Sequence, residues 1–415
     1  MSGLGDRDSG FRGRAAVAPE AVSTPRLVDS STPRLGVYVH FPFCLAKCAY
    51  CDFASYPLAT QGGLEGARGY LEALFVEIDR RAASDEFAGA VVDTIYLGGG
   101  TPTVLPAAWL EETLTRLRAR FAVSPEAEVT VEANPGTVDA AKLQALRAAG
   151  VNRLSLGVQS FSDDALRRLG RVHTAEEAKQ ELLAARAAGF DNLGLDLIYA
   201  QPGQTLAEWQ TDVEEALSFA PEHLSAYGLT LEEGTALTQS VASGVLPEPK
   251  EARYNSMYRW TERRLRAAGY RHYEISNYAR PGRESQHNRR YWQGDEYLGL
   301  GSSAHSYRGG IRWNNWPEPD VYRASLLRGL LPVAGAETLS ARERVGEMLM
   351  LGLRGVEGVS AQAIEARTGL RPEAVFGAEF AALQERGLLI VSRGRIRIPR
   401  RKWLLSDEAL LAFVR

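Results

Sequence analysis

Cysteine is scarce in this chain: its 415 residues include only three, and all three lie within eight positions, at Cys44, Cys48 and Cys51. The chain also lacks an apolar run of roughly 18 residues, which a membrane helix needs, and the charged-then-apolar N-terminus of a secretory signal. An odd, clustered set of thiols in such a chain is not a disulfide framework. We therefore expect a cytoplasmic protein without an integral membrane segment, whose thiols serve metal or redox chemistry.

No excess of one charge marks this sequence, which has 48 Lys and Arg residues against 51 Asp and Glu and a formal net charge of -3. Nucleic-acid-binding domains usually carry a basic excess, so no nucleic-acid partner is predicted. The hydrophobic share of 45% and the charged share of 24% are typical of a globular protein long enough for one large core and a smaller domain.

From Gly36 onward, short β-rich runs alternate with amphipathic helical stretches, which indicates parallel strands joined by crossover helices. Polar or glycine-rich residues follow several of these strands. In a β/α barrel, the carboxyl ends of the strands carry the ligand site. The predicted fold class is therefore α/β, an incomplete, six-stranded β/α barrel followed by a small C-terminal winged-helix-like domain. The six predicted strands are 36–40, 94–97, 128–132, 153–157, 192–198 and 224–229.

Changes in composition divide the chain into four predicted parts. Residues 1–34 are rich in Ser, Gly, Pro and Ala without apolar periodicity, so they are predicted to form a disordered tail. The partial barrel is assigned to 35–250, and an extension rich in Trp and Tyr to 251–339. The C-terminal domain is assigned to 340–415, because helical patterns at 342–353, 361–368 and 373–386 precede a hairpin-like segment at 388–398.

The cysteine loop predicts an iron-sulfur centre. Three thiolates can bind three irons of a 4Fe-4S cubane, which normally takes four cysteines, and this chain has no fourth. The remaining iron would be open to a chelating ligand such as S-adenosylmethionine. The alternatives are a zinc site that adds His40 and a set of inert thiols. Structural zinc usually uses pairs of Cys-x-x-Cys, and only one such pair occurs here.

The segment from Tyr38 to Cys51 resembles the cluster motif of the radical S-adenosylmethionine superfamily, and Gly98-Gly99-Gly100-Thr101-Pro102 resembles its second element. Successive glycines after a strand let backbone N–H groups converge on an anion such as the methionine carboxylate. From Leu35 to the C-terminus, the chain is similar to the oxygen-independent coproporphyrinogen III oxidases and to their close relatives, the haem chaperones. That resemblance rests on the segments 131–135, 156–161 and 195–199 and on Arg171.

The resemblance implies a set of residues that line the S-adenosylmethionine site. Their side chains or backbone groups offer donors and acceptors for the carboxylate, amino and ribose groups of that ligand. The implied residues are Tyr38, Tyr50, Gly99, Gly100, Thr101, Glu132, Gln159, Arg171, Asp196 and Thr230.

Two features bear on which branch of the family the chain resembles. The oxidases carry a further cysteine two positions after the third, where this chain has Phe53, which puts coproporphyrinogen decarboxylation in doubt. The segment 287–292, His-Asn-Arg-Arg-Tyr-Trp, resembles the haem motif of the chaperones. An imidazole can ligate haem iron, and aromatic rings can cover the porphyrin. The implied haem residues are His287, Asn288, Tyr291 and Trp292.

Three functions stay open from the sequence. The first is a haem chaperone with a 4Fe-4S cluster and S-adenosylmethionine as cofactors, which delivers haem to apoproteins and takes electrons from a donor, with a homodimer as a possible assembly. The second is an oxidase acting on coproporphyrinogen III. The third is an adaptor or transcriptional role of the C-terminal module. For His287 and Trp292, ordinary packing beside the barrel is the alternative to a haem site.

Overall fold

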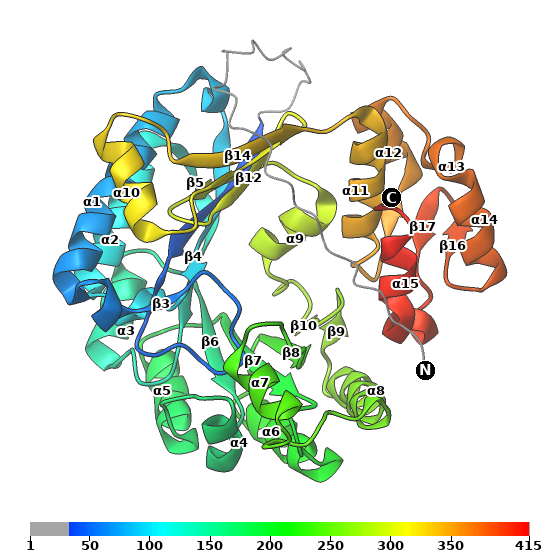
Figure 1. Cartoon of the computed structure of the whole chain (residues 1–415), viewed down its shortest axis with the longest axis horizontal. Helices are drawn as coiled ribbons and strands as arrows, with labels where there is room; N and C mark the ends of the chain where they lie inside the picture. The colour runs from blue at the N-terminus through cyan, green and yellow to red at the C-terminus, as the bar shows by residue number, and fades with distance from the viewer. Residues whose placement is uncertain (1–32, 415) are drawn as a thin grey trace. The chain divides into compact units, whose positions relative to one another are not determined.

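The computed structural model describes residues 33–414, so only the last two residues of the predicted tail, 1–34, lie inside it. Its central element is a sheet in which the six predicted strands are successive parallel neighbours (Figure 1). The incomplete barrel predicted from the sequence is therefore confirmed. These strands are β1 (Arg34–Phe41), β4 (Val91–Gly99), β5 (Ala122–Ala133), β6 (Arg153–Gln159), β7 (Leu193–Tyr199) and β8 (His223–Gly228).

Helices join the strands, as the sequence pattern predicts. Each crossover returns the chain to the same end of the sheet, so the loops after the strands gather at their carboxyl ends. The helices of this region are α1 (Gly63–Ala82), α2 (Ala107–Arg120), α3 (Ala140–Ala148), α4 (Asp163–Arg168), α5 (Ala175–Ala187), α6 (Leu206–Ser218), α7 (Ala236–Ala242) and α8 (Glu251–Ala267).

The sheet is wider than the sequence predicts, because it continues beyond both edges of the six strands to 12 strands. At one edge, β11 (Tyr297–Leu300) pairs in parallel with β1. Antiparallel strands β12 (His305–Arg308), β13 (Ile311–Asn315) and β14 (Val333–Thr338) follow it. At the other edge, β10 (Asn277–Ala279) and β9 (Arg271–His272) run antiparallel to β8. Strands β9 and β10, of two and three residues, are too short to show the alternation from which a strand is predicted, and the other added strands have only four to six residues.

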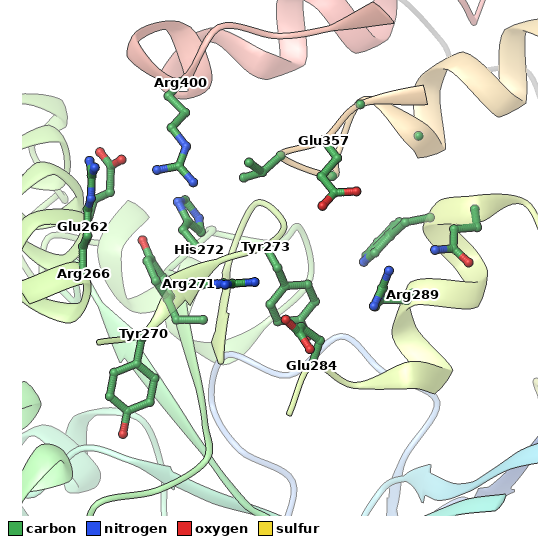
Figure 2. A pocket seen from close by; sticks show the side chains of 17 residues that line it. Glu262, Arg266, Tyr270, Arg271, His272, Tyr273, Glu284, Arg289, Glu357 and Arg400 are labelled. Atoms are coloured by element: carbon green, nitrogen blue, oxygen red, sulfur yellow. The ribbon is translucent and has the colours of Figure 1, made fainter. Parts of the chain in front are cut away.

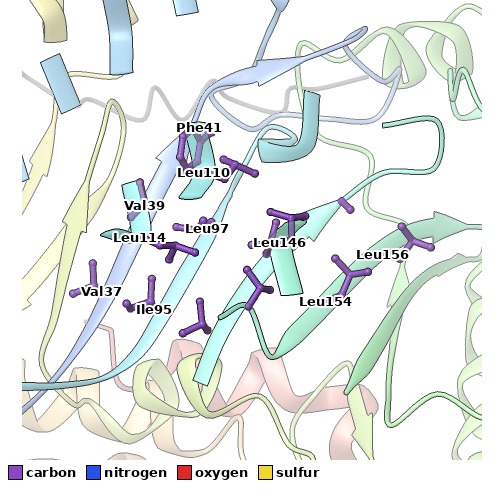
Figure 3. Close-up of a cluster of buried hydrophobic side chains, with 14 of the residues drawn as sticks. Val37, Val39, Phe41, Ile95, Leu97, Leu110, Leu114, Leu146, Leu154 and Leu156 are labelled. Atoms are coloured by element: carbon purple, nitrogen blue, oxygen red, sulfur yellow. The ribbon is translucent and has the colours of Figure 1, made fainter. Parts of the chain in front are cut away.

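Alternate residues of the parallel strands face a large apolar core. Val37, Val39 and Phe41 of β1 are fully buried. They lie in line with Ile95 and Leu97 of β4, and the leucines of α2 and α3 cover this face of the sheet (Figure 3). The residues between them, such as Tyr38 and Tyr96, lie on the opposite, interior face of the barrel, which holds the polar side chains.

A short helix, α9 (Gln286–Gln293), lies against the interior face of the barrel near the starts of the strands. Glu128 of β5 accepts hydrogen bonds from the backbone N–H groups of Gln286 and His287, at 3.2 and 3.1 Å. A carboxylate is favourable there because it meets the positive end of the helix dipole and satisfies N–H groups that lack a partner within the helix. The loop after β10 thus returns into the barrel.

The C-terminal residues form a second apolar core, which runs from Val345 to Phe413. Its helices are α11 (Ala341–Gly352), α12 (Ala361–Thr368), α13 (Pro372–Val375), α14 (Gly377–Glu385) and α15 (Ser406–Leu411). Strands β15 (Val359–Ser360), β17 (Arg395–Arg397) and β16 (Ile390–Ser392) make a three-stranded antiparallel sheet. Helices followed by a β-hairpin agree with the predicted winged-helix-like domain. Between residues 33 and 414, no helix is both long and apolar enough to cross a bilayer.

A buried carboxylate joins α1 to the added strands. Glu77 is fully buried and accepts hydrogen bonds from the backbone N–H of Gly301, the Asn315 amide and the Tyr322 hydroxyl, at 2.8, 2.7 and 2.7 Å. Arg81 lies 3.9 Å away. The Glu77 carboxylate therefore accepts hydrogen bonds from three separate segments that pack against α1.

We predict that Glu77→Ala lowers the free energy of unfolding by about 3 kcal/mol, because it leaves several buried donors without an acceptor. Urea unfolding monitored by circular dichroism measures the loss. Glu72→Ala, on the same helix with a side chain 66% exposed, is the control and should change the midpoint little. Equal midpoints for both variants would contradict this role of Glu77.

Candidate cluster and cofactor site

The cysteine loop follows β1, at the carboxyl end of the parallel strands. Its tip is held by backbone hydrogen bonds: the N–H of Ala49 donates to Leu169, and the carbonyl of Ala49 accepts from Leu237, at 3.0 and 2.8 Å. Gly170 lies directly below, where a Cβ would come within 2.8 Å of the Ala49 nitrogen. The loop is therefore fixed from two sides, and its three thiols are partly exposed.

A chain of side-chain hydrogen bonds joins two of the thiols. The Thr101 hydroxyl donates to Cys44 Sγ at 3.7 Å and accepts from the Asn134 amide at 2.6 Å. Asn134 in turn accepts from Arg171 at 2.6 Å, and Arg171 donates to Cys48 Sγ at 3.4 Å. Residues after β1, β4, β5 and α4 are thereby tied together. Donors aimed at sulfur stabilise thiolates, which is the form that binds iron.

Glycine is required in the loop after β4. Gly99 has a φ of +110°, and a Cβ there would lie 2.5 Å from the ring of His40. A Cβ on Gly100 would lie 2.5 Å from the Phe43 carbonyl and 3.0 Å from Cys44 Sγ. The backbone can therefore approach the cysteine loop only without side chains. This close approach suits a bound anion beside the cluster.

His40 is not free to ligate a metal. Its Nδ1 is 3.0 Å from the Tyr38 hydroxyl and its Nε2 is 2.9 Å from the Ala54 carbonyl, and burial lowers its pKa to about 4. Among residues 33–414, no three His, Cys, Asp or Glu side chains converge as one zinc ion would require. A cubane places each thiolate on a different iron, so it needs a wider arrangement of thiols. His40 instead orders the cysteine loop.

Three further predicted residues line the interior beside this loop. Glu132 accepts hydrogen bonds from the Tyr96 hydroxyl and the Gly99 N–H, at 2.7 and 3.1 Å, and burial raises its pKa to about 7. Burial likewise raises the pKa of Asp196. Gln159 has a φ of +65°, and its buried Oε1 has no hydrogen-bond partner among the described residues. A strained residue with an unpaired buried acceptor fits a ligand that supplies a donor.

The structure thus brings together most of the predicted site residues, and it adds Asn134, which connects Thr101 to Arg171. Asn134 could be expected near this site, because it follows β5 among the polar residues at the strand ends, but its bridging position could not be expected. Tyr50 lies on the cysteine loop, and burial raises the pKa of its hydroxyl. Thr230 follows β8 and is exposed. Their roles in binding S-adenosylmethionine stay predictions.

Comparisons with known proteins agree with this geometry. The radical SAM superfamily model matches residues 38–216, and the HemN C-terminal domain model matches residues 339–405. The chain is 38% identical over 375 residues to the heme chaperone HemW of Mycobacterium tuberculosis, covering 90% of this chain and 95% of that protein. It is 35% identical over 378 residues to HemW of Bacillus subtilis, covering 91% and 98%. The chain belongs to the HemW family.

Among solved structures, this HemW-family chain resembles coproporphyrinogen III oxidase (HemN) from Escherichia coli, described as a radical SAM enzyme. The TM-score is 0.80 at 27% identity, and the match covers 92% of this chain and 90% of that one. The superfamily assignment supports a 4Fe-4S cluster and S-adenosylmethionine as cofactors. The donor set described above, three thiols with hydrogen-bond donors and a glycine cradle, fits both groups.

The motif 287–292 of this HemW-family chain lies on α9, near the starts of the strands rather than beside the cysteine loop. His287 is 1% exposed. Its Nδ1 is 2.9 Å from the Thr94 hydroxyl and its Nε2 is 2.9 Å from the Tyr291 hydroxyl. Burial, with the charges of Arg290 and Arg153, lowers its pKa to about 3. Both ring nitrogens are therefore occupied, and a bond from His287 to haem iron, which stays a prediction, would require these contacts to break.

The raised pKa of Glu132 predicts a pH dependence of stability in the cofactor-free protein. The unfolded chain loses this proton near the usual value of 4.5, whereas the folded chain keeps it to about pH 7. The folded state then holds more protons, so this residue's contribution to stability falls as the pH rises between those values.

We expect the free energy of unfolding of Glu132→Gln, relative to that of the wild type, to rise by on the order of 2 kcal/mol from pH 5 to pH 8, because the amide cannot ionise. Unfolding measured on both proteins across this range, without cofactor, gives the difference directly and cancels other titrating groups. A difference that does not vary with pH would contradict a pKa of about 7 for Glu132 in the folded protein.

Proposed function

We propose that this chain is a haem chaperone, which holds haem and delivers it to haem-dependent proteins, with a 4Fe-4S cluster and S-adenosylmethionine as cofactors. The observation that carries the proposal is the alignment with proteins named heme chaperone HemW over 90% or more of this chain. The alignment spans the cysteine loop, the extension and the C-terminal domain together. A shared radical SAM barrel alone would not distinguish a chaperone from an oxidase.

In this proposal Cys44, Cys48 and Cys51 would hold a 4Fe-4S cluster, and the pocket beside them would hold S-adenosylmethionine. A cluster held there would supply one-electron reductive chemistry to S-adenosylmethionine. The N–H groups of the glycine loop receive the methionine carboxylate, while Glu132 and Asp196 accept from the amino and ribose groups. Phe41 and Phe43 are both buried in the apolar core beside the loop, and they anchor its first residues.

The second candidate function is oxidation of coproporphyrinogen III, favoured by the similarity to HemN over 92% of this chain. Against it stands Phe53, which occupies the position where the oxidases carry a further cysteine and whose side chain is 65% exposed. An exposed apolar ring beside the cysteine loop offers no thiol chemistry. We therefore rank the oxidase second.

The remaining expectations belong to the same proposal. The chain is proposed to act in the cytoplasm, to receive electrons from a separate donor, and to hand haem to apoproteins by direct contact. A homodimer stays a prediction. The adaptor role of the C-terminal module has no further support.

We predict that anaerobically reconstituted protein binds haem and transfers it to an apo-haem protein, whose holo spectrum appears over time. The Cys48→Ala variant should lose most of its iron and sulfide. Its rate of haem transfer then shows whether that transfer depends on the cluster. Arg167→Ala, an exposed residue nearby, is the matched control and should behave as wild type. A wild type that binds no haem would overturn the chaperone proposal.

The same preparation decides between the two functions. Incubated with coproporphyrinogen III, S-adenosylmethionine and a reductant, the chaperone should form no protoporphyrinogen IX. Product formation at a rate comparable to HemN, assayed in parallel, would make the chain an oxidase.

A further inference from the structure

The carboxyl end of β6 has an irregular backbone beside the cluster site. From Leu156 to Gln159, three residue steps of β6 lie opposite two steps of β7, from Leu195 to Leu197. The strand therefore contains a β-bulge, which adds one residue and turns the following side chains in a new direction. Bulges of this kind are frequent next to functional sites. Here the bulge ends at Gln159, the residue whose buried Oε1 has no hydrogen-bond partner among the described residues.

The backbone of Gln159 is strained. Its φ is +65°, and the N–H of Ser160 donates to the carbonyl of Val158 at 2.8 Å. A three-residue turn with a positive φ at its centre is a γ-turn of the rare, strained form. A residue other than glycine keeps such a conformation only where neighbouring groups fix it. The contacts around this turn therefore decide where the Gln159 side chain lies.

The turn brings the Gln159 amide next to the cluster site. A Cβ on Gly157 would lie 2.9 Å from Gln159 Nε2 and 2.4 Å from Asn134 Oδ1. Both amides therefore lie close to the Gly157 backbone. Asn134 is the residue that connects Thr101 to Arg171. The Gln159 side chain thus lies beside the hydrogen bonds that join two of the thiols.

A buried carboxylate holds the residues that follow the turn. Asp212 of α6 accepts hydrogen bonds from the Ser160 hydroxyl at 2.8 and 3.0 Å and from the Phe161 N–H at 2.7 Å. Asp212 is 2% exposed, and Ser160 is fully buried. The Phe161 ring also stacks on Phe219, at the end of α6, with 6.1 Å between ring centroids. The helix α6 therefore fixes the far side of the turn.

The turn accounts for the presence of a carboxylate on this face of α6. Asp212 lies on the buried face of the helix with Trp209, Val213 and Ala216, at the spacing of an apolar stripe. A buried carboxylate is costly unless hydrogen bonds compensate it. In the part of the chain that the structure describes, all the hydrogen bonds of the Asp212 side chain go to residues 160 and 161.

The residues before Gln159 are held from the side of the cysteine loop. Arg171 donates to the Gly157 carbonyl at 2.8 Å, and His173 Nε2 lies 3.2 Å from the Val158 carbonyl. These two side chains fix only the near half of the turn. The far half depends on Asp212.

We propose that Asp212 is a positioning residue for S-adenosylmethionine: by holding Ser160 and Phe161, it keeps Gln159 in the strained turn that presents its side chain to the ligand. S-adenosylmethionine offers amino and hydroxyl donors to the free Oε1 of Gln159. Asp212 acts through the turn and does not itself meet the ligand. This inference rests on the proposed cofactor and on the proposed role of Gln159.

A double-mutant cycle on the affinity for S-adenosylmethionine tests the inference. Equilibrium dialysis of the anaerobically reconstituted full chain against labelled S-adenosylmethionine gives the dissociation constants. Gln159→Ala should weaken binding roughly tenfold, and Asp212→Ala roughly fivefold to tenfold, because each loses the contact made by the Gln159 side chain. The double variant should bind within about twofold of Gln159→Ala, because Asp212 acts only through that side chain.

Three further variants separate positioning from a general loss of stability. Asp212→Asn keeps an oxygen for the Phe161 N–H, so it should bind within about threefold of wild type. Thr261→Val is the matched control, because it removes the acceptor of the Trp209 indole N–H, a buried bond of 2.7 Å on α6 that does not reach the turn. It should melt at a lower temperature yet bind as wild type does. If Asp212→Ala is too unstable to reconstitute, Ser160→Ala replaces it in the cycle, with an expected loss of about threefold.

Iron and sulfide content and melting curves are measured on each variant. If Asp212→Ala binds as tightly as wild type, or if its loss adds in full to that of Gln159→Ala, the inference is overturned while the cofactor assignment stands. An unchanged affinity of Gln159→Ala would also overturn it, as would an Asp212→Asn variant that binds no better than Asp212→Ala. If wild type binds no S-adenosylmethionine, the proposed cofactor and the inference fall together.

Discussion

The proposed site depends on one constraint: three thiolates would have to hold a cluster that has four irons. The open coordination position makes the loop chemically useful only if its surroundings are fixed, because an unsaturated cluster in a flexible loop would be lost or would bind water. The chain meets this constraint with backbone hydrogen bonds from Ala49 to two neighbouring segments. It adds the series Thr101, Asn134 and Arg171, which joins Cys44 to Cys48 through donors. The parallel sheet brings these segments to one end of the barrel, which is what the fold contributes to the chemistry.

The other end of the barrel is closed by α9, and this changes how the motif 287–292 is understood. Its histidine packs into the barrel with both ring nitrogens paired, whereas its tryptophan lines a cavity beside the C-terminal domain (Figure 2). The helix packs into the barrel with one face and lines this cavity with the other, and none of the residues that line the cavity belongs to the cysteine loop. The motif thus combines a packing role, on His287 and Tyr291, with a lining of the cavity, on Arg289 and Trp292.

Much of the fold could be predicted from the sequence, because the six central strands are short β-rich runs that alternate with amphipathic helices. The cysteine spacing and the glycine loop likewise predicted their chemistry, since few sites need those residues at that spacing. The added strands were missed because they are short: β9 to β13 have two to five residues each, and β14 has six. The return of α9 into the barrel and the bridge made by Asn134 were missed for a different reason. Both depend on contacts between segments far apart in the chain, such as Glu128 with His287, and no local pattern encodes them.

The claim on which this account depends is that one iron of the cluster is open to S-adenosylmethionine. The most direct measurement is the electron paramagnetic resonance spectrum of the reduced, anaerobically reconstituted protein with and without S-adenosylmethionine. The account predicts iron and sulfide in near-equal amounts and a cluster signal whose g-values shift when the ligand is added. An unchanged signal, or a preparation that contains zinc in place of iron and sulfide, would contradict it.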